Sequence, residues 1–230
     1  MKPRITVTYF QANGTVLYEW TITNENSAKQ RIGGLVIDTS FPSDVSVPGP
    51  WVANHFKQRN GPDALGLLCV VPDDSPNLGI APGRSLGPIR FSSNLVPGLI
   101  EAVFYPTPDD LKDTSATGLS NGQFFDGASP WVREQLLKLD TSDRHRVRPS
   151  LIGPATSLSE DSVPKILSEL NAAASQHADF NAVRKRLHEV PPTADRGNLS
   201  TWIAESLKQS NAELEGEFLR ALGWRLQILK

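Results

Sequence analysis

Gly14–Asn24 reads GTVLYEWTITN and carries the clearest strand pattern in the chain. Large apolar residues occupy every second position, so one face of the extended chain is apolar: Val16, Tyr18, Trp20 and Ile22. The Asn13-Gly14 dipeptide in front of it is typical of a tight hairpin turn. A lone strand cannot bury a side chain as large as Trp20, so this stretch predicts a mid-sheet strand that faces a second layer.

Six further stretches between Arg4 and Pro106 have strand character, and Pro, Gly, Asn and Asp separate them. They are Arg4–Phe10, Ile32–Asp38, Trp51–Phe56, Leu65–Val71, Leu86–Ser92 and Leu99–Tyr105. Seven short strands without a helical period predict an antiparallel Ig-like β-sandwich over residues 1–106. A jelly roll or an open barrel is the alternative that the same strands can build. Gly33-Gly34 predicts a β-bulge or a close backbone approach.

The strand pattern ends at about Pro106. Residues 107–156 are rich in Pro, Asp, Ser, Thr and Gly and contain one short helical stretch, Trp131–Leu139. Loops of this length are uncommon inside one compact domain, so this segment is predicted to be an irregular connector.

Residues 157–230 have a helical period and predict a C-terminal helical bundle, which makes the chain α+β. Ser162 is the expected N-cap of a first helix, with Pro164 in its first turn. Asp179 is expected to cap a second helix that Pro191-Pro192 ends. One long third helix is expected from about Leu199 to Leu229. The alternative is a capping box at Ser210 and Glu213 that starts a new helix.

Composition excludes several classes of partner. The 230 residues carry a net charge of −2, which gives no bulk attraction to nucleic acid or to an anionic membrane. No apolar run is long enough to cross a bilayer. Lys2-Pro3-Arg4 leads directly into a strand, so no signal peptide is expected in this sequence. Cys69 is the single cysteine; it excludes an internal disulfide and is expected to be a buried apolar residue.

Gly118–Gly122 matches the G-x-S-x-G nucleophile elbow, with Ser120 as the candidate nucleophile. That motif needs an apolar strand before it and a helix after it. Asp109–Thr117 precedes it and is not strand-like, so the match is interpreted as chance. A serine hydrolase that uses Ser120 with a distant His and Asp is kept as an alternative.

Candidate ligands for a metal are scattered. Asp73, Ser75 and Asn77 have the alternating oxygen spacing of a calcium loop, but no glutamate follows where an EF-hand needs one. A surface turn is favoured there, and a solvated acidic loop is favoured for Asp109, Asp110 and Asp113. The four histidines form no ligand pair, which makes a zinc site improbable: His55, His145, His177 and His188.

Two other features suggest binding surfaces. The basic cluster Arg144–Arg148 is flanked by Asp140 and Asp143, which weaken its field, so a solvated linker is favoured over a phosphate site. Trp20 and Trp51 would suit sugar stacking if they were exposed. Core or edge packing is favoured for both.

The order of short motifs in the first half resembles uncharacterised β-sandwich modules of secreted or surface proteins of environmental bacteria. It consists of Y-x-W-x-I-x-N at Tyr18–Asn24, a turn at Pro48–Trp51, I-x-P-G-x-S at Ile80–Ser85, F-x-S at Phe91–Ser93 and Pro97-Gly98. The resemblance implies an exported, extracellular or periplasmic module without catalytic residues.

These observations predict a non-enzymatic binding or interaction module. No catalytic, cofactor-binding or metal-binding residue is assigned, and no cofactor is expected. The expected partner is an unidentified protein or glycan. Besides the hydrolase, the other alternative is a structural subunit that forms a homo-oligomer through its C-terminal helices.

Overall fold

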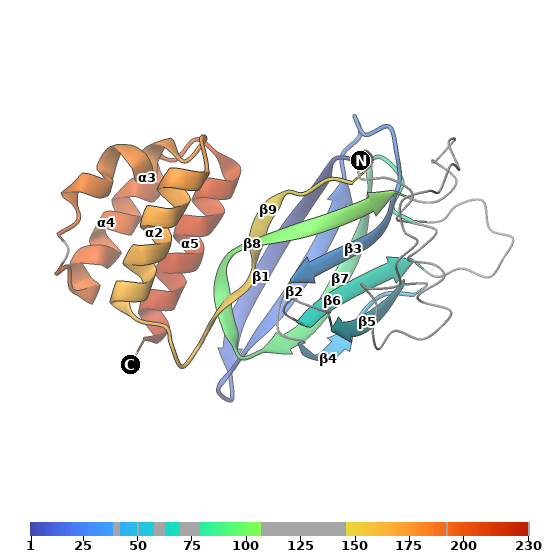
Figure 1. Ribbon diagram of the computed structural model, residues 1–230, viewed down its shortest axis with the longest axis horizontal. Helices are drawn as coiled ribbons and strands as arrows, with labels where there is room; N and C mark the ends of the chain where they lie inside the picture. The colour runs from blue at the N-terminus through green and yellow to red at the C-terminus, as the bar shows by residue number, and fades with distance from the viewer. Residues whose placement is uncertain are drawn as a thin grey trace, which may run out of the picture. The chain divides into compact units, whose positions relative to one another are not determined.

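The computed structural model describes residues 1–38, 42–49, 51–57, 63–69, 79–106, 146–191 and 193–229 (Figure 1). The strands are β1 (Pro3–Ala12), β2 (Thr15–Asn24), β3 (Ile32–Asp38), β4 (Ser43–Ser46), β5 (Trp51–Lys57), β6 (Asp63–Cys69), β7 (Arg84–Ser93), β8 (Leu95–Pro106) and β9 (Ser150–Ser157). The helices are α2 (Val163–Gln176), α3 (Asn181–Arg186), the short 3-10 helix η3 (Leu187–Glu189), α4 (Arg196–Gln209) and α5 (Glu213–Ile228).

The chain divides into two compact units. The sandwich unit comprises Met1–Ala12, Leu17–Ser93 and Ile100–Ser150. The helical unit comprises Asn13–Val16, Asn94–Leu99 and Leu151–Lys230. Both units are therefore built from segments that are distant in the sequence.

The first sheet has the strand order β1-β2-β7-β4, and β2 lies inside it. Alternate residues of β2 are buried, and the Trp20 side chain is 0% exposed. Phe91 of β7 stacks on Tyr18 and meets Trp20 edge-on, with ring centroids 5.1 Å apart in both pairs. The predicted mid-sheet strand with Trp20 in the core is confirmed. Asn13 and Gly14 have φ of 50° and 79°, the positive values that a tight hairpin requires.

The second sheet has the strand order β5-β6-β3-β8-β9. β3 pairs antiparallel with β6 on one side and with β8 on the other. Leu35 of β3 lies opposite Phe104 of β8, and both side chains are buried. The β3–β8 register shifts between Ile32 and Gly34, which confirms the irregularity predicted at Gly33-Gly34.

The N-terminal half is an antiparallel Ig-like β-sandwich and the C-terminal part is helical, so the fold class is α+β as predicted. Each sheet has buried apolar residues, such as Ile22 in the first and Ile37 in the second. The described strands form two separate sheets and not a barrel.

Two strands were not expected from the sequence. β4 is short and polar, and β9 contains Gly153-Pro154, where irregular chain was predicted. Both lie at the end of their sheet's strand order. An edge strand pairs on one side only, so it tolerates proline and needs no alternating apolar face.

The first predicted helix start is confirmed and the second is wrong. Ser162 caps α2, its Oγ accepting a hydrogen bond from the Lys165 N–H at 3.3 Å, and Pro164 lies in the first turn. Asp179 does not cap α3, because the N-cap position is Phe180. The Phe180 side chain is apolar and cannot accept a hydrogen bond from the unpaired N–H groups at the start of the helix.

The expected long helix from Leu199 to Leu229 is also wrong. The chain leaves helical geometry at Ser210, with φ −70° and ψ 127°, and at Ala212, with φ −91° and ψ 132°. No capping box forms: the N-cap of α5 is Ala212, and Ser210 ends α4 instead. The break lets α5 pack against α4. None of the described helices is long and apolar enough to span a membrane.

Candidate functional site

Many residues that the sequence singled out lie outside the described part of the chain. They are Ser120 with its whole G-x-S-x-G motif, Asp73, Ser75, Asn77, Asp109, Asp110, Asp113, the Trp131–Leu139 stretch, Arg144 and His145. The side chains of His55 and Cys69 are likewise not described. Cys69 lies on β6 opposite Trp51 of β5.

The described histidines do not gather into a site. His177 stacks on Phe180 with ring centroids 4.8 Å apart, and His188 is exposed on η3. Among the residues that the structure describes, no group of three or more His, Cys, Asp and Glu side chains is arranged to hold a metal ion.

Neither Trp20 nor Trp51 of the sandwich unit offers an exposed ring for stacking. Trp20 is fully buried, and Trp51 is 6% exposed, as the sequence favoured. Arg146, from the basic cluster, lies over the Tyr105 ring at 5.2 Å. Burial lowers the pKa of Arg146. Arg148 forms an exposed ion pair with Glu101 at 3.3 Å, which partly neutralises the cluster.

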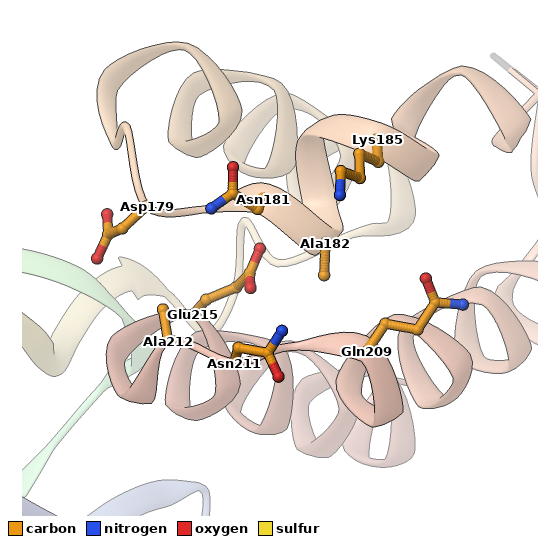
Figure 2. A pocket seen from close by; sticks show the side chains of 8 residues that line it. All are labelled: Asp179, Asn181, Ala182, Lys185, Gln209, Asn211, Ala212 and Glu215. Atoms are coloured by element: carbon orange, nitrogen blue, oxygen red, sulfur yellow. The ribbon is translucent and has the colours of Figure 1, made fainter.

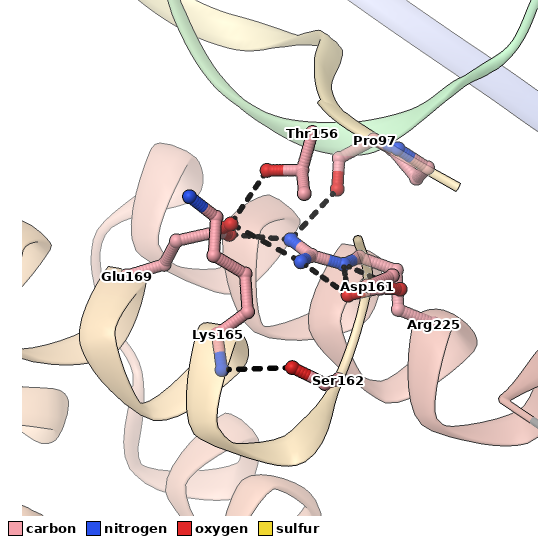
Figure 3. A network of polar contacts seen from close by, with 7 residues as sticks. All are labelled: Pro97, Thr156, Asp161, Ser162, Lys165, Glu169 and Arg225. Atoms are coloured by element: carbon pink, nitrogen blue, oxygen red, sulfur yellow. Dashed lines mark hydrogen bonds and ion pairs between the residues drawn. The ribbon is translucent and has the colours of Figure 1, made fainter. Parts of the chain in front are cut away.

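A buried ion network lies inside the helical unit (Figure 3). Arg225 of α5 is held by Asp161, with Nη2–Oδ1 at 2.6 Å, and by Glu169 of α2. The Arg225 and Asp161 side chains are 0% exposed. Burial alone lowers the pKa of Arg225, but the hydrogen bonds that Arg225 donates to Asp161 and Glu169 outweigh this effect and raise it.

Two further segments join the same network. The Thr156 hydroxyl donates to Glu169 Oε1 at 2.7 Å, and Arg225 Nη1 donates to the Pro97 carbonyl at 3.4 Å. Gly98, the next residue, lies close to Ala155: a Cβ atom at position 98 would lie 2.9 Å from the Ala155 Cβ. A network this enclosed offers no surface to a ligand, so its role is to hold the unit together.

The first pocket of the helical unit, named here the Glu215 pocket, has a volume of about 280 Å³ (Figure 2). It lies between the start of α3 and the α4–α5 junction. Its lining residues are mostly exposed and polar: Asp179, Asn181, Lys185, Gln209 and Asn211, with Ala182, Ala212 and Glu215.

The buried carboxylate of this pocket is already used. Glu215 is 1% exposed, and its Oε1 accepts from the Val183 N–H at 2.9 Å. Ser210 Oγ donates to its other oxygen at 2.8 Å. Glu215 thus supplies from α5 the cap that Phe180 cannot give to α3. This assigns the carboxylate a structural role.

The second pocket, named here the Trp202 pocket, has a volume of about 400 Å³. One part of its wall is apolar: Val190, Pro191, Ala194 and Trp202. The other part is polar: Arg186, Glu189, Asn198, Thr201 and Glu205. The pocket thus combines an apolar wall with charged and polar side chains that can orient a ligand.

Arg186 holds the polar wall in place. Its Nη2 pairs with Glu189 at 2.8 Å and with Glu205 at 2.6 Å. The hydrogen bond that Arg186 donates to Glu189 is the largest cause that raises the pKa of Arg186, and its bond to Glu205 adds to this effect. The guanidinium lies 5.9 Å from the Trp202 ring, and the Trp202 Nε1–H donates to the Arg186 carbonyl at 3.0 Å.

The sequence analysis missed this pocket. Arg186 and Glu189 are three residues apart, and so are Trp202 and Glu205, a spacing that places each pair on one helical face. Those spacings are a local signal, but they do not say that the two pairs meet. The turn at Pro191 and the packing of α3 on α4 bring them together.

No protein-family model matches the sequence. No curated protein matches it either. Among solved structures, the chain is similar to an uncharacterised protein from Nocardia farcinica, whose crystal structure is described as revealing an immunoglobulin-like fold. The identity is 13% and the TM-score 0.34, over 45% of this chain and 77% of the other.

Proposed function

We propose that this protein is a non-enzymatic binding module, and that the Trp202 pocket of its helical unit is the ligand site. The observation that carries the proposal is the preformed wall of the pocket. Arg186 is fixed by two carboxylates beside Trp202, next to apolar side chains. Such pre-organisation reduces the entropy that binding must overcome.

The chemistry of the pocket supports binding over catalysis. Its charged side chains are engaged with one another, and the Thr201 hydroxyl donates to the Gly197 carbonyl at 3.1 Å. Its lining residues include neither histidine nor cysteine. Nucleophilic catalysis needs a hydroxyl or thiol within reach of a base, and no lining residue of the pocket provides that arrangement.

The proposal includes export to the periplasm or the cell exterior. The resemblance of the first half to modules of secreted and surface proteins supports this location. Fractionation of cells that express the native gene from its genomic start tests it. Recovery of the protein in the culture medium or periplasm supports export, and recovery in the cytoplasm alone contradicts it.

A peptide and glycan array probed with the full chain tests the binding function. We expect a defined set of ligands, whereas an array without any specific signal counts against the proposal.

In parallel, generic ester substrates test the hydrolase alternative. Hydrolysis that disappears in Ser120→Ala would establish an enzyme and overturn the proposal. Sedimentation of the full chain shows whether it assembles into an oligomer instead of binding a ligand.

A further inference from the structure

The charge of the Trp202 pocket is unbalanced. Its lining contains one cation, Arg186, and two anions, Glu189 and Glu205, so the lining groups sum to one negative charge. Arg186 contacts the Oε2 atom of each carboxylate. Within the described part of the chain, the Oε1 atoms of both carboxylates have no hydrogen-bond partner.

Both carboxylates are also accessible. The side chain of Glu189 is 43% exposed and that of Glu205 is 53% exposed, whereas Arg186 is 11% exposed. A ligand that enters the pocket therefore meets acceptor oxygens first, while the buried guanidinium stays behind them. A cation can bind these oxygens without displacing Arg186, because each carboxylate accepts at both oxygens.

The apolar wall adds a second requirement. Val190, Pro191 and Ala194 line the pocket together with Trp202. A hydrated point cation gains nothing from this surface. A cation on an aliphatic stem buries methylene groups on it while its charged head stays at the rim.

Resting on the binding function proposed above, we infer that the Trp202 pocket takes a cationic group carried on an aliphatic stem. The head group lies at Glu189 and Glu205, and the stem lies along Val190 and Pro191. A lysine side chain of a protein partner and a free diamine both supply this chemistry.

NMR titration of the ¹⁵N-labelled full chain tests the inference, with the indole N–H of Trp202 as the reporter. The probes are N-acetyl-lysine methylamide, cadaverine and N-acetyl-norleucine methylamide, which keeps the stem and lacks the charge. We expect both cations to shift the Trp202 resonance. The norleucine probe is expected to bind up to about fivefold more weakly than the lysine probe, the upper limit for one partly exposed ion pair. Added salt should weaken the binding of the two cationic probes and leave the binding of the norleucine probe unchanged.

Stronger binding of the lysine probe than of cadaverine identifies a protein side chain as the source, and the reverse order identifies a free diamine. The Glu205→Gln substitution is expected to weaken binding of the lysine probe about two- to fivefold. Glu160→Gln is the matched control, since Glu160 is exposed in the same unit and lines neither pocket, and it should have no effect.

The failure of this inference is distinguishable from the failure of the binding function. Equal binding of the norleucine probe, stronger binding of N-acetyl-glutamate methylamide, or no shift with any cation overturns the assignment of a cationic ligand. If the array still detects a ligand whose binding perturbs Trp202, the binding function stands with a different ligand class. An array without any ligand overturns both.

Discussion

At the scale of single residues, Trp20 and Arg225 are the two largest fully buried side chains among the described residues. The Trp20 side chain is 0% exposed in the sandwich, and Phe91 meets its ring edge-on. Such a ring stabilises the folded state both through its transfer from water and through close packing. Its removal therefore loses the transfer free energy and also leaves a cavity.

Trp20→Ala is therefore expected to lower the free energy of unfolding of the sandwich by about 3–5 kcal/mol. Phe10→Ala is the control, because Phe10 lies on the neighbouring strand β1 and is 57% exposed. The control should change stability by no more than about 0.5 kcal/mol. Urea denaturation measures both, and a Trp20→Ala variant as stable as the parent would contradict the core position of this ring.

Arg225 is the charged counterpart in the helical unit. The carboxylates of Asp161 and Glu169 surround it, and the Asp161 side chain is 0% exposed. Burial lowers the pKa of Arg225, but its hydrogen bonds to Asp161 and Glu169 raise it above the usual arginine value, so the stabilising contribution of its charge is lost only in strong alkali. The charge of Arg225 therefore does not change in the pH range in which proteins are handled.

Arg225→Met removes the cation and leaves two carboxylates close together, one of them fully buried. We expect a loss of about 3–5 kcal/mol, as for other buried pairs in which one partner is removed. Arg220→Met on the exposed side of α5 is the control and should be nearly neutral. Thermal unfolding followed by circular dichroism at 222 nm reports on the helices. An equal melting temperature for both variants would show that the network contributes nothing.

At the scale of elements, the α4–α5 junction shows how tertiary contacts override a local pattern. The apolar period of residues 199–229 continues through Ser210, and no proline interrupts it. The break between α4 and α5 is stabilised by hydrogen bonds that one continuous helix would not form. Glu215 reaches the start of α3, and Ser210 donates to Glu215. A side chain from a distant helix cannot be recognised as a cap from sequence spacing.

Glu215→Ala should destabilise the helical unit by about 1–3 kcal/mol, because it leaves the buried Val183 N–H without an acceptor. Glu215→Gln keeps an acceptor oxygen and should lose less. Gln227→Ala, at an exposed position of α5, is the control for helix propensity. Hydrogen exchange of the Val183 amide provides the direct measurement. Unchanged protection in Glu215→Ala would contradict the capping role.

The strands were more predictable than the helix ends. β2 was predicted almost to the residue because its β-branched and aromatic residues alternate with period two, and β3 because it is a short apolar run next to turn residues. β4 and β9 were missed because an edge strand needs no such pattern. The strands that could be predicted are those in which the local sequence pattern alone determines the secondary structure.

At the scale of the whole molecule, the helical unit is not one continuous stretch. It includes Asn94–Leu99 and Leu151–Lys230, and the Arg225 network uses Pro97 and Thr156 from outside the helices. The sequence predicted residues 157–230 as the helical segment, with an apolar surface that needs further cover, but it did not identify the earlier residues that complete its core.

Residues 157–230 expressed alone are therefore expected to be aggregated, oligomeric or poorly folded. A bundle of about seventy residues is close to the lower limit for a self-sufficient core, and this fragment also lacks Pro97 and Thr156. Analytical ultracentrifugation with thermal denaturation tests the expectation. A monomer that melts cooperatively would defeat it and would show that the helices fold independently.

The candidate site was the least predictable feature. Trp202 appeared in the sequence only as one more apolar residue of a long helix. The sequence analysis did not single out Arg186, Glu189 or Glu205. Their meeting depends on the turn after η3 and on the end of α4, and neither follows from local propensity.

The most direct test of the binding function is to block the Trp202 pocket and repeat the array with the full chain. Thr201→Arg places a long side chain at an exposed position of the pocket wall, and Ala204→Arg places the same side chain on α4 outside both pockets. The parent and Ala204→Arg should bind the same ligands, and Thr201→Arg should bind them about tenfold or more weakly, roughly 1.4 kcal/mol or more. Equal binding by all three proteins would contradict the pocket assignment, and binding by none would contradict the proposed function itself.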